Sequence, residues 1–260
     1  MKKLSEILGY DIIDIHSHFN HGVEGDVDRS GVQLGCHMES LEFLFEEYEN
    51  IGIIAGGYST YSSVLTYGRI PEENEYLHEL AKNDPRIYQW VVIHPEQEET
   101  FRQARQMLGH EKVLGIKIHP YFHKYTITDY ADKLFSFADE MGAIIVMHPD
   151  KIREMPKFCD KYPNMKLIIA HLGNNDFIDV VSESKHGNIY VDTSGGASYQ
   201  NNIIERTVSI VGADKILFGT DTYSAAFQAG RIALARIDDD SKKKILHDNA
   251  VRLFPHAFKR

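Results

Sequence analysis

The chain has 260 residues, of which 43% are hydrophobic and 25% charged, and its formal net charge is −10 at pH 7. This composition is typical of a globular protein with a substantial core, and the acidic balance argues against a protein that binds along nucleic-acid phosphates. The two cysteines, Cys36 and Cys159, lie far apart, and no apolar run approaches the roughly 18 residues of a membrane span, so we expect a soluble cytoplasmic protein.

Short apolar runs rich in β-branched residues recur along the chain and predict buried parallel strands. The eight runs lie near residues 11–16, 51–56, 87–93, 113–119, 143–148, 166–171, 188–192 and 215–220. Stretches with helical spacing separate most of them, as in Leu41, Leu44, Phe45 and Tyr48, and again in Tyr130, Leu134, Phe137 and Met141. Strands that alternate with amphipathic helices predict an α/β protein. Eight of them in this length favour one (β/α)₈ TIM barrel over residues 1–260.

Three further features complete the expected barrel. A last helix near residues 241–254 is expected to pack Leu246, Ala250 and Leu253 on the barrel wall. Two long connections, residues 19–38 and 57–70, are expected to lie over the catalytic face, because long loops in a compact domain are often functional. Three tyrosines of the second connection are candidates to line or cover the pocket: Tyr58, Tyr61 and Tyr67.

Six histidines and one aspartate close the apolar runs. They are His16, His18, His94, His119, His148, His171 and Asp221. The last residues of parallel strands meet at one end of a barrel, so these side chains are expected to converge at its C-terminal mouth. Residues i and i+2 of a strand share a face, so His16 and His18 should point together into that mouth. Imidazoles and a carboxylate in one cleft predict a metal site there.

The motifs together carry a family resemblance. They are D-x-H-x-H at Asp14–His18, G-x-K-x-H-P at Gly115–Pro120, apolar-H-P at His148, A-H-L-G at His171, V-D-T-S at Asp192, F-G-T-D ending at Asp221, and N-A-x-x-L-F at Asn249–Phe254. This ordered set resembles the metal-dependent amidohydrolase superfamily, and more narrowly its amidohydrolase-related branch with aminocarboxymuconate-semialdehyde decarboxylase-like proteins. The resemblance implies that His16, His18, His148 and Asp221 hold a divalent metal. It further implies that His171 acts beside the metal-bound water as an acid–base or electrophilic group.

Lys117 and His119 share a face of the fourth strand and are candidates to bind substrate, as is Tyr58. Some superfamily members carry a carboxylated lysine that bridges two metals at this strand. Lys117 is therefore a candidate bridge, a cation for a substrate carboxylate with a catalytic role, or a structural charge paired with an acid such as Asp14. We favour the cation in this branch, because a desolvated ammonium suits an anionic group. His94 is expected to support the site rather than form it.

The expected activity is hydrolysis of a small amide, ester or lactone by metal-activated water, with Asp221 accepting a proton. The first alternative is a non-oxidative decarboxylase or hydratase of a small carboxylic acid with the same ligands. A TatD-like deoxyribonuclease ranks lower, since it expects a glutamate at position 117 and a more basic surface. We expect one Zn²⁺ per chain, with Mn²⁺ or a second metal as alternatives. The expected substrate is a small anion, with no nucleic-acid or membrane partner, and a homodimer is left open.

Overall fold

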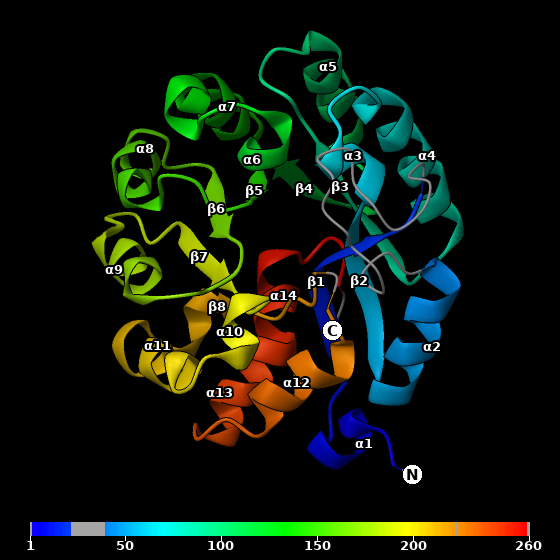
Figure 1. Ribbon diagram of the computed structural model, residues 1–260, viewed down its shortest axis with the longest axis vertical. Coiled ribbons are helices and arrows are strands. Elements are labelled where there is room, and N and C mark those ends of the chain that lie inside the picture. The colour runs from blue at the N-terminus through cyan, green and yellow to red at the C-terminus, as the bar shows by residue number, and fades with distance from the viewer. Residues whose placement is uncertain (1, 22–39, 222, 259–260) are drawn as a thin grey trace.

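The structure is a computed structural model that describes residues 2–21, 40–221 and 223–258. Eight parallel strands follow one another in chain order in a single sheet, and the helices surround the strands (Figure 1). The strands are β1 (Ile12–Phe19), β2 (Ile53–Thr60), β3 (Ile87–Val92), β4 (Val113–Ile118), β5 (Ile144–Met147), β6 (Lys166–Ile169), β7 (Ile189–Asp192) and β8 (Ile216–Leu217). The predicted (β/α)₈ TIM barrel is confirmed.

Helices connect successive strands and cover the outside of the barrel. The α-helices are α1 (Leu4–Leu8), α2 (Leu41–Ile51), α3 (Tyr61–Leu65), α4 (Ile70–Asn83), α5 (Glu98–Met107), α6 (Pro120–His123), α7 (Ile127–Met141), α8 (Met155–Lys161), α9 (Asn175–Glu183), α10 (Gly196–Tyr199), α11 (Ile203–Val211), α12 (Ala225–Ala233), α13 (Asp239–Lys243) and α14 (Asn249–Leu253). Short 3₁₀ turns occupy η2 (Ile152–Glu154) and η3 (Ala213–Lys215), and a π-helical turn, η4 (Lys244–Asp248), joins α13 to α14. Within the described residues, no helix is long and apolar enough to cross a membrane.

The last and first strands are joined by hydrogen bonds that continue beyond the short β8. The backbone N–H of Ile15 donates to the carbonyl of Phe218 at 3.0 Å, and that of His18 donates to the carbonyl of Asp221 at 3.2 Å. Ser17 and Asp221 also form a parallel bridge. The segment that carries Asp221 is therefore fixed directly beside the segment that carries His16 and His18.

The interior of the barrel is packed with side chains from its strands. Trp90 is 1% exposed, and its indole N–H donates to the carbonyl of Ile15 at 2.7 Å. Gly57 faces the same space, where an added Cβ would lie 2.6 Å from a methyl group of Leu114. A side chain at this glycine would collide with the interior layer, so the packing requires glycine here.

Two of the expected features differ in the structure. Leu246 joins the outer core, but Ala250 and Leu253 pack with strand residues inside the barrel, so the end of the chain closes the N-terminal end of the barrel rather than covering its wall. The second long connection is shorter than expected, because β2 continues to Thr60 and α3 follows at once. The first connection, residues 19–38, lies almost entirely outside the described residues.

Candidate active site

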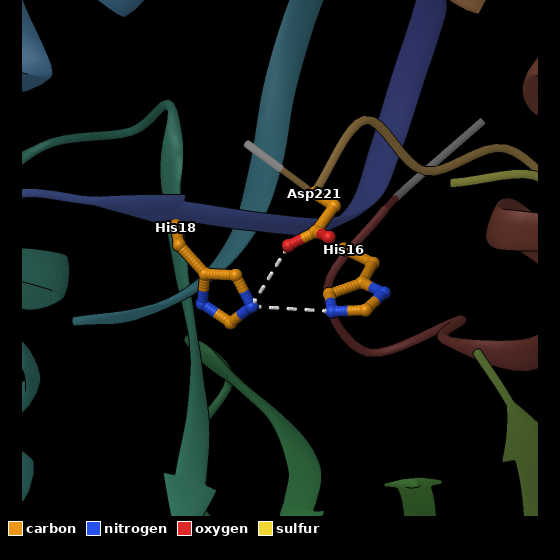
Figure 2. A group of neighbouring side chains, drawn as sticks. All are labelled: His16, His18 and Asp221. Atoms are coloured by element: carbon orange, nitrogen blue, oxygen red, sulfur yellow. Dashed lines mark hydrogen bonds and ion pairs between the residues drawn. The ribbon is translucent and has the colours of Figure 1, made fainter. Parts of the chain in front are cut away.

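His16, His18 and Asp221 form a compact group at the C-terminal mouth of the barrel (Figure 2). The Nε2 atoms of the two imidazoles lie 3.3 Å apart, and Nε2 of His18 lies 3.3 Å from Oδ1 of Asp221. Both imidazoles are buried, and Asp221 is partly buried. The sequence expectation that His16 and His18 point together is therefore met, although β1 continues past them to Phe19.

The hydrogen-bond partners of the two histidines determine which nitrogen of each ring carries the proton. Nδ1 of His18 lies 3.0 Å from the carbonyl oxygen of Ser59, which can only accept, so this nitrogen donates and Nε2 is bare. Nδ1 of His16 lies 2.9 Å from Oδ2 of Asp192, so its Nε2 is bare as well. Burial lowers the pKa of both imidazoles, which favours these neutral forms.

Three acceptor atoms consequently face one another, two bare imidazole nitrogens and one carboxylate oxygen. Acceptors in such contact repel one another unless a cation lies between them. Neutral imidazoles with a carboxylate are also the usual ligands of zinc and other transition metals. The donor set of His16, His18 and Asp221 thus fits a divalent metal.

Local backbone features orient this group. The pairing of β1 with β2 shifts register between Asp14 and Ser17, and this irregularity allows Ile15 and His16 both to face the interior. Asp221 adopts a left-handed conformation with φ of 58°, uncommon for a residue other than glycine. Such strained conformations persist where surrounding contacts over-determine them, and they concentrate at functional sites.

Asp14 lies behind the group and ties the first strand to the last. Its carboxylate accepts from the backbone N–H of His16 at 2.9 Å and from the hydroxyl of Thr220 at 2.5 Å, and it also accepts from Tyr48. Burial raises the pKa of Asp14 to about 7, although these hydrogen bonds lower it in part. Asp14 is thus engaged on the outer side of β1, so it does not provide the charge partner considered for Lys117.

Lys117 reaches the group from β4. Its side chain is 1% exposed, and Nζ lies 2.7 Å from Nε2 of His16. Burial lowers the pKa of Lys117 to about 8, while Asp221 and Asp192 favour the charged form. A buried ammonium at the mouth of the barrel is a suitable partner for an anionic substrate group.

His148 and His171 lie together at the mouth, and the ring of His171 lies 5.3 Å from that of His16 between centroids. Nδ1 of His148 is 3.2 Å from Nε2 of His171, whose Nδ1 lies 3.9 Å from Oδ2 of Asp221. Burial lowers the pKa of His171 to about 4 and that of His148 to about 2. His148 is not among the described residues whose ligand atoms gather around His16, so its expected role as a metal ligand stays a proposal.

His119 stacks on His148, with ring centroids 4.0 Å apart. Nδ1 of His119 accepts the backbone N–H of Phe122 at 3.3 Å and caps α6, so the ring proton is on Nε2. His119 is therefore a hydrogen-bond donor at the wall of the site. This fits its expected contact with substrate.

Tyr58, Tyr61 and His94 occupy different positions relative to the mouth of the barrel. Tyr58 is fully buried and packs against Phe19 on the outer side of the barrel, so it does not line the mouth. The reason is the alternation of β2, which turns Ser59 inward and Tyr58 outward. Tyr61 lies 5.7 Å from His18 between ring centroids, whereas Nε2 of His94 lies 3.2 Å from the carbonyl oxygen of His123.

Asp192, Ser194 and His123 were not assigned roles from the sequence. The carboxylate of Asp192 contacts His16, and the hydroxyl of Ser194 lies 2.8 Å from Nδ1 of His171. Asp192 closes the seventh strand just as the histidines close theirs, so the same signal could have identified it. His123 donates to the carbonyl of Ser63 from a turn, where no comparable pattern exists.

The sequence matches the family model described as amidohydrolase over residues 13–256, nearly the whole chain. The chain belongs to the amidohydrolase family. The resemblance drawn from its strand-end motifs is thereby confirmed. Comparison of this amidohydrolase with curated proteins gave no significant match.

Solved structures with the same fold cover almost all of the amidohydrolase chain. A 5-carboxyvanillate decarboxylase from Sphingomonas paucimobilis is 14% identical with a TM-score of 0.77, over 94% of this chain and 99% of that one. A dihydroxybenzoic acid decarboxylase from Polaromonas sp., with bound manganese and 2-nitroresorcinol, is 17% identical with a TM-score of 0.75, over 94% and 97%. A probable 2-pyrone-4,6-dicarboxylic acid hydrolase from Acinetobacter baumannii, with citric acid bound, is 14% identical with a TM-score of 0.70, over 94% and 99%.

Proposed function

We propose that this amidohydrolase is a metal-dependent, non-oxidative decarboxylase of a small aromatic carboxylic acid. The observation that carries the proposal is the buried ammonium of Lys117 beside the group of His16, His18 and Asp221. A carboxylate could contact Lys117 at the edge of that group. The names of two relatives with this fold, which are decarboxylases of substituted benzoic acids, support the same substrate class.

His16, His18 and Asp221 are the proposed core of the metal site, with His148 as a fourth ligand and one metal per chain. The donor set suits Zn²⁺ or Mn²⁺, and the manganese in the Polaromonas relative makes Mn²⁺ the first metal to test. When bound, the metal supplies positive charge that stabilises negative charge developing on a substrate oxygen.

The other residues have separate proposed roles. Lys117 binds the substrate carboxylate, and His119 donates a hydrogen bond from Nε2 to a second polar group of the ring. In the reaction, the bond between the ring carbon and the carboxylate breaks, carbon dioxide leaves, and the ring carbon takes a proton. That proton comes from water, and His171 is the proposed relay for it, because its ring lies between His148 and Asp221.

Hydrolysis of a lactone or related carbonyl is the second candidate. The probable pyrone dicarboxylate hydrolase that shares the fold favours it. The same residues would serve, with Asp221 or His171 accepting the proton of the attacking water. We rank this candidate second. Lys117 is suited to hold a carboxylate, and in hydrolysis of a lactone the bond to that carboxylate does not break.

A direct assay separates the two candidates. The purified protein, loaded with Mn²⁺ or Zn²⁺, is incubated with 5-carboxyvanillate, a panel of dihydroxybenzoates and 2-pyrone-4,6-dicarboxylate. We expect release of carbon dioxide from at least one benzoate and none from a His18→Ala control. Ring opening of the pyrone without carbon dioxide would support the hydrolase instead. Failure on the whole panel by protein shown to hold one metal per chain would contradict the decarboxylase assignment.

A further inference from the structure

Asp192 lies at the centre of a buried hydrogen-bond network at the end of β7. Its Oδ2 accepts from Nδ1 of His16 at 2.9 Å. Its Oδ1 accepts from the backbone N–H groups of His171 at 3.0 Å and Ser194 at 2.9 Å, and from the hydroxyl of Ser194 at 2.5 Å. Asp192 is fully buried, so an ionised carboxylate here needs this many donors. These four contacts supply them.

Only one assignment of donors and acceptors fits the hydrogen bonds among Asp192, Ser194 and His171. An ionised carboxylate can only accept hydrogen bonds, so the one hydroxyl proton of Ser194 points to Asp192. The oxygen of Ser194 must then accept at its other contacts, which are Nδ1 of His171 at 2.8 Å and Nδ1 of His16 at 3.2 Å. His171 therefore carries its proton on Nδ1, and its Nε2 is bare.

The same logic extends one residue further. Nε2 of His171 lies 3.2 Å from Nδ1 of His148. A bare nitrogen must accept, so His148 donates from Nδ1, and its own Nε2 is bare as well. Each member thus donates to the next in the order His148, His171, Ser194 and Asp192.

We propose that Asp192 and Ser194 are positioning residues that fix the tautomers of His171 and His148, with the proton of each ring on Nδ1, so that Nε2 of His171 accepts from His148 and Nε2 of His148 is bare. Asp192 fixes His16 in the same way through its other oxygen. One carboxylate therefore sets the proton position of His16 directly, and those of His171 and His148 through Ser194. The inference rests on the proposed function only for its effect on turnover, because the tautomers can be measured without metal or substrate.

Loss of the Ser194 hydroxyl tests the branch that leads to His171, because His16 keeps its own contact with Asp192. Ser194→Ala removes the contact with His171 and the longer contact with Nδ1 of His16 at 3.2 Å, and it leaves the 2.9 Å contact between Asp192 and His16 in place. Asp192→Asn disturbs both branches, because an amide can donate as well as accept. Residues that orient a metal-binding or catalytic side chain through a hydrogen bond are typically worth about 10- to 100-fold in metal affinity or activity. A matched control is Ser209→Ala, in which an exposed serine of α11 is removed.

The test is imidazole ¹⁵N NMR on the full-length chain after chelation, at about pH 8, where ordinary histidines are neutral. His171→Gln, His148→Gln and His16→Gln variants assign the signals. We expect wild type to show His16, His171 and His148 protonated on Nδ1. Ser194→Ala should move His171 and His148 away from that tautomer, leave His16 unchanged, and lower kcat by about 10- to 100-fold with little change in KM.

Two results would overturn the proposal. One is a wild-type His171 or His148 protonated on Nε2, and the other is an unchanged His171 tautomer in Ser194→Ala. If Asp192→Asn does not fold, the tautomers of His171 and His148 in Ser194→Ala still test the proposal. The expected tautomers in a protein that decarboxylates nothing would uphold the positioning role while refuting the proposed reaction.

Discussion

The ammonium of Lys117 and Nε2 of His16 lie 2.7 Å apart, both buried at the mouth of the barrel. The same bare nitrogen of His16 faces His18 and is the proposed metal-binding atom. One lone pair cannot serve an ammonium and a metal at once. The charge on Lys117 therefore acts against metal binding, even as it prepares the site for an anion.

The first prediction concerns this competition. Lys117→Met should tighten binding of Mn²⁺ by at least about tenfold, because it removes a buried positive charge beside a ligand. It should also abolish the decarboxylation of benzoates. Titration against a competing chelator measures the first effect, with the exposed-lysine variant Lys185→Met as the control. A loss of metal in Lys117→Met would instead show that Lys117 is a ligand, as in a carboxylated bridge between two metals.

The second prediction ranks the metal-binding residues. His18→Ala should abolish stoichiometric metal, because it removes one of the three donors that meet in the group of His16, His18 and Asp221. His148→Ala should weaken binding less, since its ring contacts His171 and His119 and lies outside that trio. Elemental analysis and circular dichroism on each variant separate lost metal from lost fold. Equal losses of bound metal in both variants would identify His148 as a ligand equivalent to His18.

The third prediction concerns His171. His171→Asn should retain nearly normal metal affinity and lose about 10²- to 10⁴-fold in kcat, as is typical for a group that transfers a proton. Metal titration and steady-state kinetics on this one variant decide among three roles. Lost metal would identify a ligand, and an unchanged rate would identify a structural residue.

The fourth prediction concerns the pH dependence of stability. Glu205 on α11 accepts from Arg231 on α12 at 2.8 Å and from the backbone N–H of Arg236 at 3.0 Å. Burial alone would raise the pKa of Glu205, but these hydrogen bonds lower it to about 2. The folded protein thus binds the Glu205 proton less readily than the unfolded chain does. The resulting stabilisation is present above the ordinary glutamate pKa and is lost as the pH falls toward 2.

Glu205→Gln should therefore lower the free energy of unfolding by about 2 kcal/mol at pH 7, the usual size for a hydrogen bond to a charged group. The difference from wild type should shrink steadily between the ordinary glutamate pKa and pH 2. Urea unfolding across this range measures it, with Glu46→Gln on the exposed side of α2 as the control. A difference that stays constant with pH would mean that packing, rather than charge, accounts for the effect.

Much of this protein follows from local patterns in its sequence. The apolar runs predict the strands and their order, because a buried parallel strand needs apolar side chains on both faces. The position of His16 two residues before His18 predicts that they act together, because alternate residues of a strand share a face. The convergence of the strand-end residues then follows from parallel strands closing into a barrel.

Other features depend on contacts between distant segments, and only the tertiary structure decides them. The irregular pairing of β1, the left-handed backbone of Asp221 and the separation of His148 from the His16 group depend on how neighbouring strands are aligned. β2 continues to Thr60, beyond its apolar run, so Tyr58 lies within the strand, where alternation turns it away from the mouth. The tautomer of His171 depends on Asp192 and Ser194, about twenty residues further along the chain. Proton positions are set by partners in space, and no periodicity along the chain encodes them.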